Sequence, residues 1–125
     1  MTINLKITED VYYRTVISLF KSIYPFSRCS PRELDILAEL LYLDHLYSKT
    51  ITDIDIRNKL LFDYDTKIKI IEKLNISLAV LDNNISALRK KNIIIGKKLT
   101  NNLKFDMGSS ILFNFEIYND GTKNT

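Results

Sequence analysis

Apolar residues recur at spacings of three and four along most of the chain, which is the spacing of helices that bury one face. The densest such pattern covers residues 31–47, where apolar side chains occupy much of the helical circumference. A helix of that kind is typical of the centre of a core. Directly before it, Ser30, Pro31 and Glu33 fill the N-cap, first and third positions of a capping box. We therefore expect a capped central helix over residues 31–47.

A second helical pattern precedes this one and predicts a helix over residues 9–24. Glu9 and Asp10 lie in its first turn, where acidic side chains favour the helix dipole. Pro25 ends it, because the residue before a proline is disfavoured in the helical conformation. Its apolar stripe is rich in aromatic residues, which pack in cores and are also enriched at protein interfaces. Both interpretations stay open, and under the second the interface residues are Tyr12, Tyr13, Val16 and Phe20.

The stretch from Thr66 to Leu103 contains the most informative order of elements. A helix that ends at Leu74 is followed by the three-residue turn Asn75-Ile76-Ser77, and the serine is a good N-cap for a second helix. The buried stripe predicted for this second helix has the spacing of one helical face, four residues and then three. It comprises Leu81, Ile85 and Leu88.

A small sheet is predicted directly after this pair of helices. Asn92 ends the second helix, since asparagine is the best residue after glycine for the left-handed conformation at a helix end. The β-branched run at residues 93–95 predicts a strand, and the alternation over residues 111–117 predicts its return strand. Between them we expect a loop over residues 96–108, with at most a short ordered piece at residues 99–103.

Two further segments have weaker patterns. Residues 3–7 alternate between apolar and polar side chains and predict a short N-terminal strand. Residues 51–62 fit either a short strand or a short helix over residues 53–61, and we favour the helix. Asp63 or Asp65 then caps the helix that precedes the three-residue turn.

Length and composition indicate one domain, because 125 residues suffice for a core without disulfides or metal. Within it we expect an N-terminal strand and helix at residues 1–28, a helix-turn-helix unit over residues 29–118 and a loose polar tail at residues 119–125. No stretch approaches the ~18 apolar residues of a transmembrane helix, and the N-terminus lacks the apolar core of a signal peptide. With Cys29 as the single cysteine, the sequence fits a reducing cytoplasm.

Charge is unevenly distributed along the chain, although the net charge is only +3. Residues 1–74 carry 11 basic and 11 acidic side chains, whereas residues 75–104 carry six basic side chains and one acidic side chain. The positive field therefore lies on the second helix of the pair and on the segment after it, where a polyanion would need it. A solvated lysine-rich face is the alternative explanation.

Two stretches resemble bacterial winged helix-turn-helix regulators. SPRELDILAELL, at residues 30–41, is similar to their opening helix. Residues 71–95, with the pattern I-x-x-x-L-N-I-S and then L-x-x-x-I-x-x-L-x-K-K-N-I-I, resemble the multiple-antibiotic-resistance-type regulators, with Asn92 in place of the usual glycine. The resemblance covers roughly residues 30–117 and specifies fold better than function. It implies a mainly α fold with a small β-wing (α+β), extended here by the N-terminal strand and helix.

The resemblance also implies where DNA would be contacted. In such proteins the second helix enters the major groove, and the wing touches phosphates or the minor groove. Asn83 is suited to an adenine edge. Two departures lower the expected affinity: the first two turns of the helix carry no Arg or Lys, and Asp82 has the same charge as a phosphate. Carried over, the candidate DNA-binding residues are Ala79, Asn83, Ser86, Arg89, Lys90, Lys97 and Lys98.

No catalytic or metal-binding constellation is apparent in the sequence. His45 and Cys29 are the single residues of their kinds, whereas a zinc site needs three or four ligands. The acidic pairs at residues 53/55 and 63/65 are better explained as helix caps. None of the three glycines has the spacing of a phosphate-binding loop. We expect neither an enzyme nor a cofactor.

The leading hypothesis is a small non-enzymatic winged-helix protein that binds double-stranded DNA in the cytoplasm, as a transcriptional regulator of a phage or a bacterium. The helix over residues 9–24 would drive dimerisation. The alternative is a structural component of a phage virion or connector, which uses the same fold for contacts within a homo-oligomer or with an assembly partner. The abundance of Ile, Lys and Asn fits the AT-rich coding sequences of many phages and low-GC bacteria.

Overall fold

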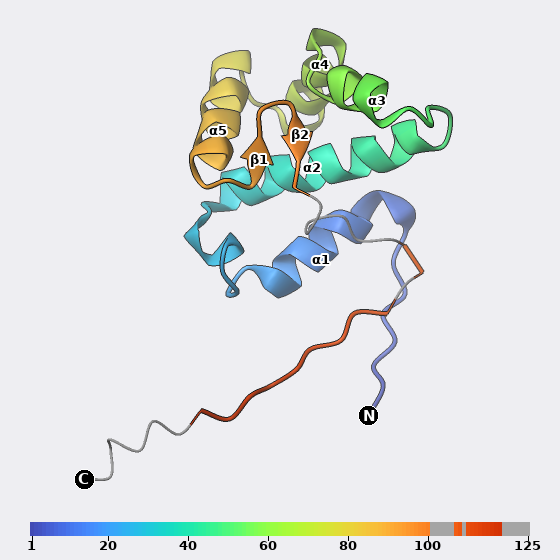
Figure 1. Ribbon diagram of the computed structural model, residues 1–125, viewed down its shortest axis with the longest axis vertical. Coiled ribbons are helices and arrows are strands. Elements are labelled where there is room, and N and C mark those ends of the chain that lie inside the picture. The colour runs from blue at the N-terminus through green and yellow to red at the C-terminus, as the bar shows by residue number, and fades with distance from the viewer. Residues whose placement is uncertain (101–106, 109, 119–125) are drawn as a thin grey trace, which may run out of the picture.

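The computed structural model describes residues 1–100, 107–108 and 110–118, so the tail predicted at residues 119–125 lies outside the described residues. The described part is mainly helical and has one small antiparallel sheet of two strands. Figure 1 shows the long helix α2 across the middle, with α1 on one side and α3, α4, α5 and the strands on the other. The elements are α1 (Tyr12–Phe20), α2 (Pro31–Ser48), α3 (Ile54–Leu61), α4 (Tyr64–Leu74), α5 (Leu78–Lys90), β1 (Ile94–Ile95) and β2 (Lys98–Leu99), with 3-10 turns at Glu9–Val11 and Phe26–Arg28.

The predicted capped central helix is confirmed as α2. The hydroxyl of Ser30 accepts a hydrogen bond from the backbone N–H of Glu33 at 3.1 Å, and the Glu33 carboxylate accepts one from the Ser30 N–H at 2.7 Å. These two bonds form the capping box that the sequence predicts. Ile36, Leu37 and Leu40 are almost completely buried, and α1, α3, α4 and α5 all pack against α2. The centre of the core is therefore α2.

The helix predicted over residues 9–24 is shorter in the structure. Its first residues form a 3-10 turn, and α1 ends at Phe20 rather than at Tyr24. The apolar pattern continues to Ile23, but that side chain is 45% exposed. Because short helices depend on the packing of an apolar face, the helix stops where its buried stripe stops. The chain then turns through a cis peptide bond before Pro25.

The segment at residues 51–62 forms the helix α3, which confirms the favoured alternative. The carboxylate of Asp53 accepts hydrogen bonds from two backbone N–H groups of the first turn, at 2.9 and 3.2 Å. At the next helix Asp63, rather than Asp65, is the N-cap and accepts a hydrogen bond at 2.7 Å. Both helices thus begin at an aspartate that satisfies backbone N–H groups left without partners by the helix.

The two strands form a tight hairpin that differs from the predicted sheet. Strand β1 pairs with β2, with Ile94 opposite Leu99, whereas the sequence predicts a return strand over residues 111–117. Gly96 has a φ of +62°, which glycine adopts without steric cost. A two-residue turn at Gly96-Lys97 therefore closes the hairpin. The predicted loop over residues 96–108 is thus wrong at its start, and the ordered piece predicted at residues 99–103 lies partly outside the described residues.

Neither of the two terminal strands predicted from alternation is present. Residues 1–7 and 110–118 have no regular secondary structure, which corrects the predictions over residues 3–7 and 111–117. A strand must pair its backbone groups with a neighbour, and no backbone hydrogen bond joins either segment to another described part of the chain. Both segments lie beside or beyond α1, away from the hairpin (Figure 1).

Of the helices that the structure describes, none combines the length and apolar character needed to cross a membrane.

Candidate nucleic-acid interface

One apolar face seats α5 against the core. The helix begins as predicted at Ser77, whose hydroxyl accepts a hydrogen bond from the backbone N–H of Val80 at 3.1 Å. Asn75, in the left-handed conformation (φ +54°), ends α4 and turns the chain towards α5. The predicted buried stripe is confirmed, because its three side chains are at most 3% exposed. They are Leu81, Ile85 and Leu88.

The opposite face of α5 points to solvent and carries the predicted groove-facing residues. Ala79, Asn83, Ser86 and Lys90 are all exposed. They follow one another at spacings of four, three and four residues, which places them on a single helical face. The structure therefore brings these four residues together on the surface.

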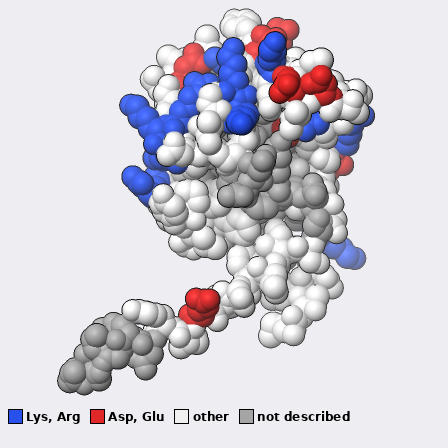
Figure 2. All heavy atoms as spheres, in the orientation of Figure 1, with Lys and Arg blue, Asp and Glu red and all other residues white. Residues whose placement is uncertain are grey.

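The hairpin continues this surface beyond the end of α5. Asn92 has a φ of +59°, the left-handed conformation expected at a helix end, and leads the chain directly into β1. Lys97 and Lys98 are exposed on the hairpin. Figure 2 shows Lys and Arg side chains gathered over α5 and the hairpin, with acidic side chains beside them over α3 and α4. We call the surface formed by Ala79, Asn83, Ser86, Lys90, Lys97 and Lys98 the α5–hairpin face.

Arg89 joins the helix to the hairpin. Its Nε donates a hydrogen bond to the backbone carbonyl of Gly96 at 2.8 Å. Its guanidinium carbon also lies 5.8 Å from the centre of the Phe62 ring, within the range of a cation–π contact. Arg89 is exposed, as predicted, but one of its donors is used within the chain. Its main structural effect is to hold the hairpin turn near the last turn of α5.

Asp82, whose charge is the same as that of a phosphate, forms an ion pair with a neighbouring helix. The Nζ of Lys67, on α4, lies 2.8 Å from its Oδ1. The ion pair offsets that charge and lowers the repulsion that a polyanion would meet there. The pair joins residues 15 apart in the chain, so helical spacing within α5 could not have predicted it.

Lys91, unlike its exposed neighbour Lys90, is partly buried and pairs with a buried carboxylate. Its Nζ lies 2.6 and 2.7 Å from the two carboxylate oxygens of Glu33, a side chain that is almost fully buried at the start of α2. Burial alone would raise the pKa of Glu33. Hydrogen bonds from Lys91 and from the Ser30 backbone outweigh burial and hold that pKa below its ordinary value. The pair fastens the end of α5 to the N-terminus of α2.

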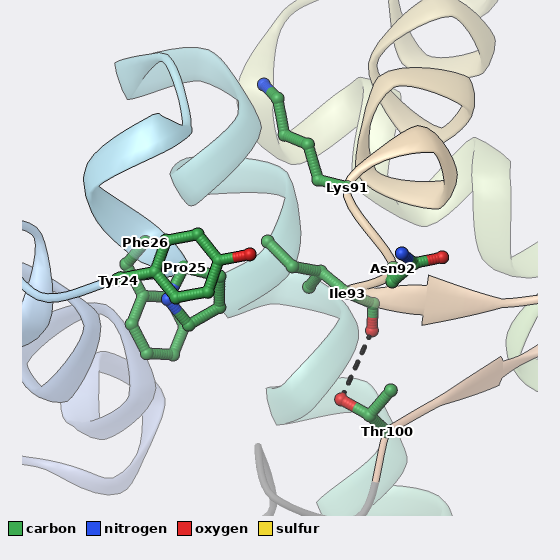
Figure 3. A pocket seen from close by; sticks show the side chains of 7 residues that line it. All are labelled: Tyr24, Pro25, Phe26, Lys91, Asn92, Ile93 and Thr100. Atoms are coloured by element: carbon green, nitrogen blue, oxygen red, sulfur yellow. Dashed lines mark hydrogen bonds between the residues drawn. The ribbon is translucent and has the colours of Figure 1, made fainter.

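An open pocket of about 480 Å³ lies between the cis-proline turn and the start of the hairpin. Figure 3 shows Tyr24 and Phe26 on one side and Asn92 and Ile93 on the other. Thr100 also lines the pocket, and its hydroxyl lies 3.5 Å from the Ile93 carbonyl. The lining mixes ring faces with the polar groups of Tyr24, Lys91, Asn92 and Thr100 and contains no acid–base pair or nucleophile, so the pocket supports no particular chemistry.

The predicted interface on the first helix is corrected by the burial of its residues. Tyr13, Val16 and Phe20 are at most 9% exposed and belong to the core of the chain itself. Tyr12 is half-buried and packs against that core. Three of these four side chains are therefore already covered by the chain itself. Of the two interpretations of the aromatic stripe, core packing is the one that the structure supports.

Within the described residues, no cluster of three or more His, Cys, Asp or Glu side chains is arranged to hold a metal ion. The Nε2 of His45 lies 3.2 Å from a carboxylate oxygen of Glu9, which also accepts a hydrogen bond from Lys49 at 2.7 Å. Cys29 is partly buried, and burial raises the pKa of its thiol, so the thiolate form that reacts as a nucleophile is disfavoured.

Comparisons of this chain with protein-family models, with curated proteins and with solved structures found no match.

Proposed function

We propose that this chain is a winged helix-turn-helix protein that binds double-stranded DNA and acts as a transcriptional regulator of a phage or a bacterium. The observation that carries the proposal is the α5–hairpin face. It combines an exposed polar face of a helix that follows a three-residue turn with a lysine-bearing hairpin directly behind that helix. A helix and a hairpin in that order suit one major groove and its flanking phosphates.

Each part of the face has a role in the proposed complex. The N-terminal half of α5 enters the major groove, where Asn83 hydrogen-bonds an adenine edge and Ser86 contacts a base or a phosphate. Lys90 and the two hairpin lysines contact phosphates, which fix the position of the protein without reading sequence. Arg89 keeps the hairpin close to the helix through Gly96, so the two contacts are made together.

The first experiment is fluorescence anisotropy of the full chain with a labelled AT-rich duplex at several salt concentrations. Each phosphate that a lysine neutralises releases bound counterions, so the logarithm of the affinity falls linearly with the logarithm of the salt concentration. A steep linear decrease supports the proposal. Failure to bind at low salt contradicts it, because electrostatic attraction is strongest there.

Reversing the two hairpin charges tests the phosphate contacts. We expect Lys97→Glu with Lys98→Glu to weaken binding to every duplex by about tenfold or more and to reduce the salt slope by about 2. The matched control is Lys21→Glu with Lys59→Glu, which changes the net charge equally at exposed lysines outside the α5–hairpin face. If both double variants lose the same affinity, the effect comes from net charge alone and the hairpin contact is wrong.

Asn83→Ala tests base recognition separately from charge. We expect it to relax the preference for adenine at one position of the binding site, at a cost of about 1–3 kcal/mol for the preferred base. Selection of bound sequences from a random duplex library, for the wild type and the variant, measures the change. Asn84→Ala is the control, since the amide of Asn84 donates to the Val80 carbonyl within α5 at 2.7 Å. An unchanged preference in Asn83→Ala would show that Asn83 does not face a base.

A structural role in a phage virion or connector is the second candidate, and one observation favours it. Large apolar side chains are strongly exposed at both ends of the described chain, among them Ile3 (74%), Leu5 (61%), Phe115 (85%) and Ile117 (92%). Exposed apolar groups of this size are typical of surfaces that another protein covers. This candidate predicts assembly without DNA binding, so the salt titration separates the two.

A further inference from the structure

The two terminal segments have the side-chain pattern of strands but no strand partner. Apolar side chains occupy the odd positions of both segments, at Ile3, Leu5 and Ile7 and again from residue 111 to residue 117. Alternation of this kind is typical of a strand with one buried face. In the structure these side chains are 39–92% exposed, and no hydrogen bond pairs the backbone of either segment with another described one. Both segments therefore lack the neighbour that their pattern requires.

The two segments meet at one open hollow on α1. The hollow, of about 790 Å³, is lined by Ile3 and Leu5 from one segment, by Ile111 and Phe113 from the other, and by Leu19 of α1. Phe113 is anchored there, because its ring packs edge-to-face on the Phe20 ring with centroids 5.5 Å apart. Beyond it, residues 114–118 run away from the body of the molecule (Figure 1). A receiving segment and a protruding one thus lie on the same side of the chain.

We propose that this surface binds a second copy of the same chain by reciprocal strand exchange. Residues 115–118 of one copy pair with residues 4–7 of the other, and the symmetric contact repeats in reverse, as in a closed two-fold dimer. The two paired stretches match in length, since each has four residues and spans about 14 Å as a strand. The exchange supplies each copy with the backbone partner that its strand-like segments lack.

The charges and the apolar alternation of the two segments favour one register for the pair of exchanged strands. With Lys6 opposite Glu116 in antiparallel strands, Leu5 faces Ile117 and Ile7 faces Phe115. Opposite charges and apolar pairs directly across a sheet both stabilise it. Every odd position of one strand then meets an odd position of the other, so one face of the new sheet is apolar and covers the hollow. A register shifted by one residue would place apolar side chains opposite polar ones.

The exposed apolar surface is large enough for a dimer. A stable interface buries roughly 1,200–2,000 Å² in total. Phe115, 85% exposed, occurs twice in a symmetric contact, and an aromatic side chain buries roughly 150 Å² or more. The two rings contribute about a quarter of the lower limit, and the backbones and aliphatic side chains of both segments add the remainder. A free chain would instead leave this apolar surface in water.

Sedimentation of the full chain over a range of concentrations tests the proposal. We expect a species of twice the 14.6 kDa chain mass. Phe115→Asp should raise the dimer dissociation constant about 100-fold, because the charge would be buried in the apolar face. The matched control is Leu112→Asp, at an equally exposed leucine of opposite parity, for which we expect little change. A wild type that stays monomeric at about 0.1 mM, or equal effects of the two variants, would overturn the proposal.

Disulfide trapping distinguishes exchange between chains from pairing within one chain. In a Cys29→Ser background, a chain with Leu5→Cys is mixed with a chain with Ile117→Cys and oxidised. Exchange predicts a disulfide-linked heterodimer of the two chains. If the two chains do not cross-link, while one chain with both substitutions closes a disulfide within itself, the segments pair within the monomer and the proposal is wrong. Neither experiment involves DNA, so their outcome is independent of the proposed DNA binding.

Discussion

Leu81→Ala is expected to lower the free energy of unfolding by about 3 kcal/mol, within the range of about 2–5 kcal/mol for a leucine truncated in a packed core. The Leu81 side chain is 0% exposed and lies in the stripe that seats α5 on the core. Truncation loses the favourable free energy of burying the removed methyl groups. It also leaves a cavity that the neighbouring helices fill only partly. Urea unfolding followed by circular dichroism measures the loss.

The neighbouring residue provides the control for this prediction. Val80 is next in the chain to Leu81 but is 37% exposed on α5. We expect Val80→Ala to change stability by about 0.5 kcal/mol or less, because an exposed helical position leaves no cavity and alanine favours the helix. Similar losses for the two variants would mean that α5 is not seated on the core by the stripe described above.

Lys91→Met is expected to lower stability by about 2 kcal/mol at neutral pH. The substitution keeps the side-chain length but removes the cation from Glu33, which leaves a buried carboxylate with only its cap hydrogen bonds. Breaking a fully buried ion pair costs about 3–5 kcal/mol. The Lys91 side chain is 22% exposed, so water reduces the loss. Lys90→Met, at the exposed lysine before it, should have almost no effect on stability.

The pH dependence of the same pair gives a second measurement. The folded-state pKa of Glu33 lies below its ordinary value, so the contribution of the pair is complete above the ordinary carboxyl pKa and is lost as the pH falls through the folded value. In Lys91→Met, burial is no longer offset by the lysine, and a neutral carboxyl is favoured. The stability difference between wild type and Lys91→Met should therefore narrow as the pH falls, beginning above the ordinary carboxyl pKa, where Glu33 of the variant starts to take up a proton. A difference that is constant from pH 7 to pH 3 would contradict this role of Glu33.

Helix positions were predictable where local chemistry and periodicity agree. The capping box before α2 and the caps of α3, α4 and α5 consist of residues within four positions of each other, so the sequence contains the whole interaction. The stripe of α5 was predictable for the same reason. The terminal strands were not, because alternation specifies only a preference for pairing, and the presence of a partner is a property of the whole molecule.

The candidate site was predictable in its exposed part and not in its internal contacts. Exposure of Asn83 and Lys90 follows from their position opposite the buried stripe of α5. The contacts of Asp82 with Lys67 and of Lys91 with Glu33 join residues 15 and 58 apart in the chain. Sequence spacing carries no information on such pairs. The sequence therefore does not show that Lys90 is exposed to solvent whereas Lys91, the next residue, pairs with the buried Glu33 carboxylate.

The hydrogen bond between Arg89 and Gly96 leaves the other residues of the hairpin turn free to vary. Its acceptor is a backbone carbonyl, which every amino acid supplies, so the bond does not depend on the side chains that follow Gly96. Residues 97 and 98 are therefore free to gain or lose charge by substitution while the turn keeps its position beside α5. The charge of the hairpin and the architecture of the fold are thus set by separate residues, and one can evolve without the other.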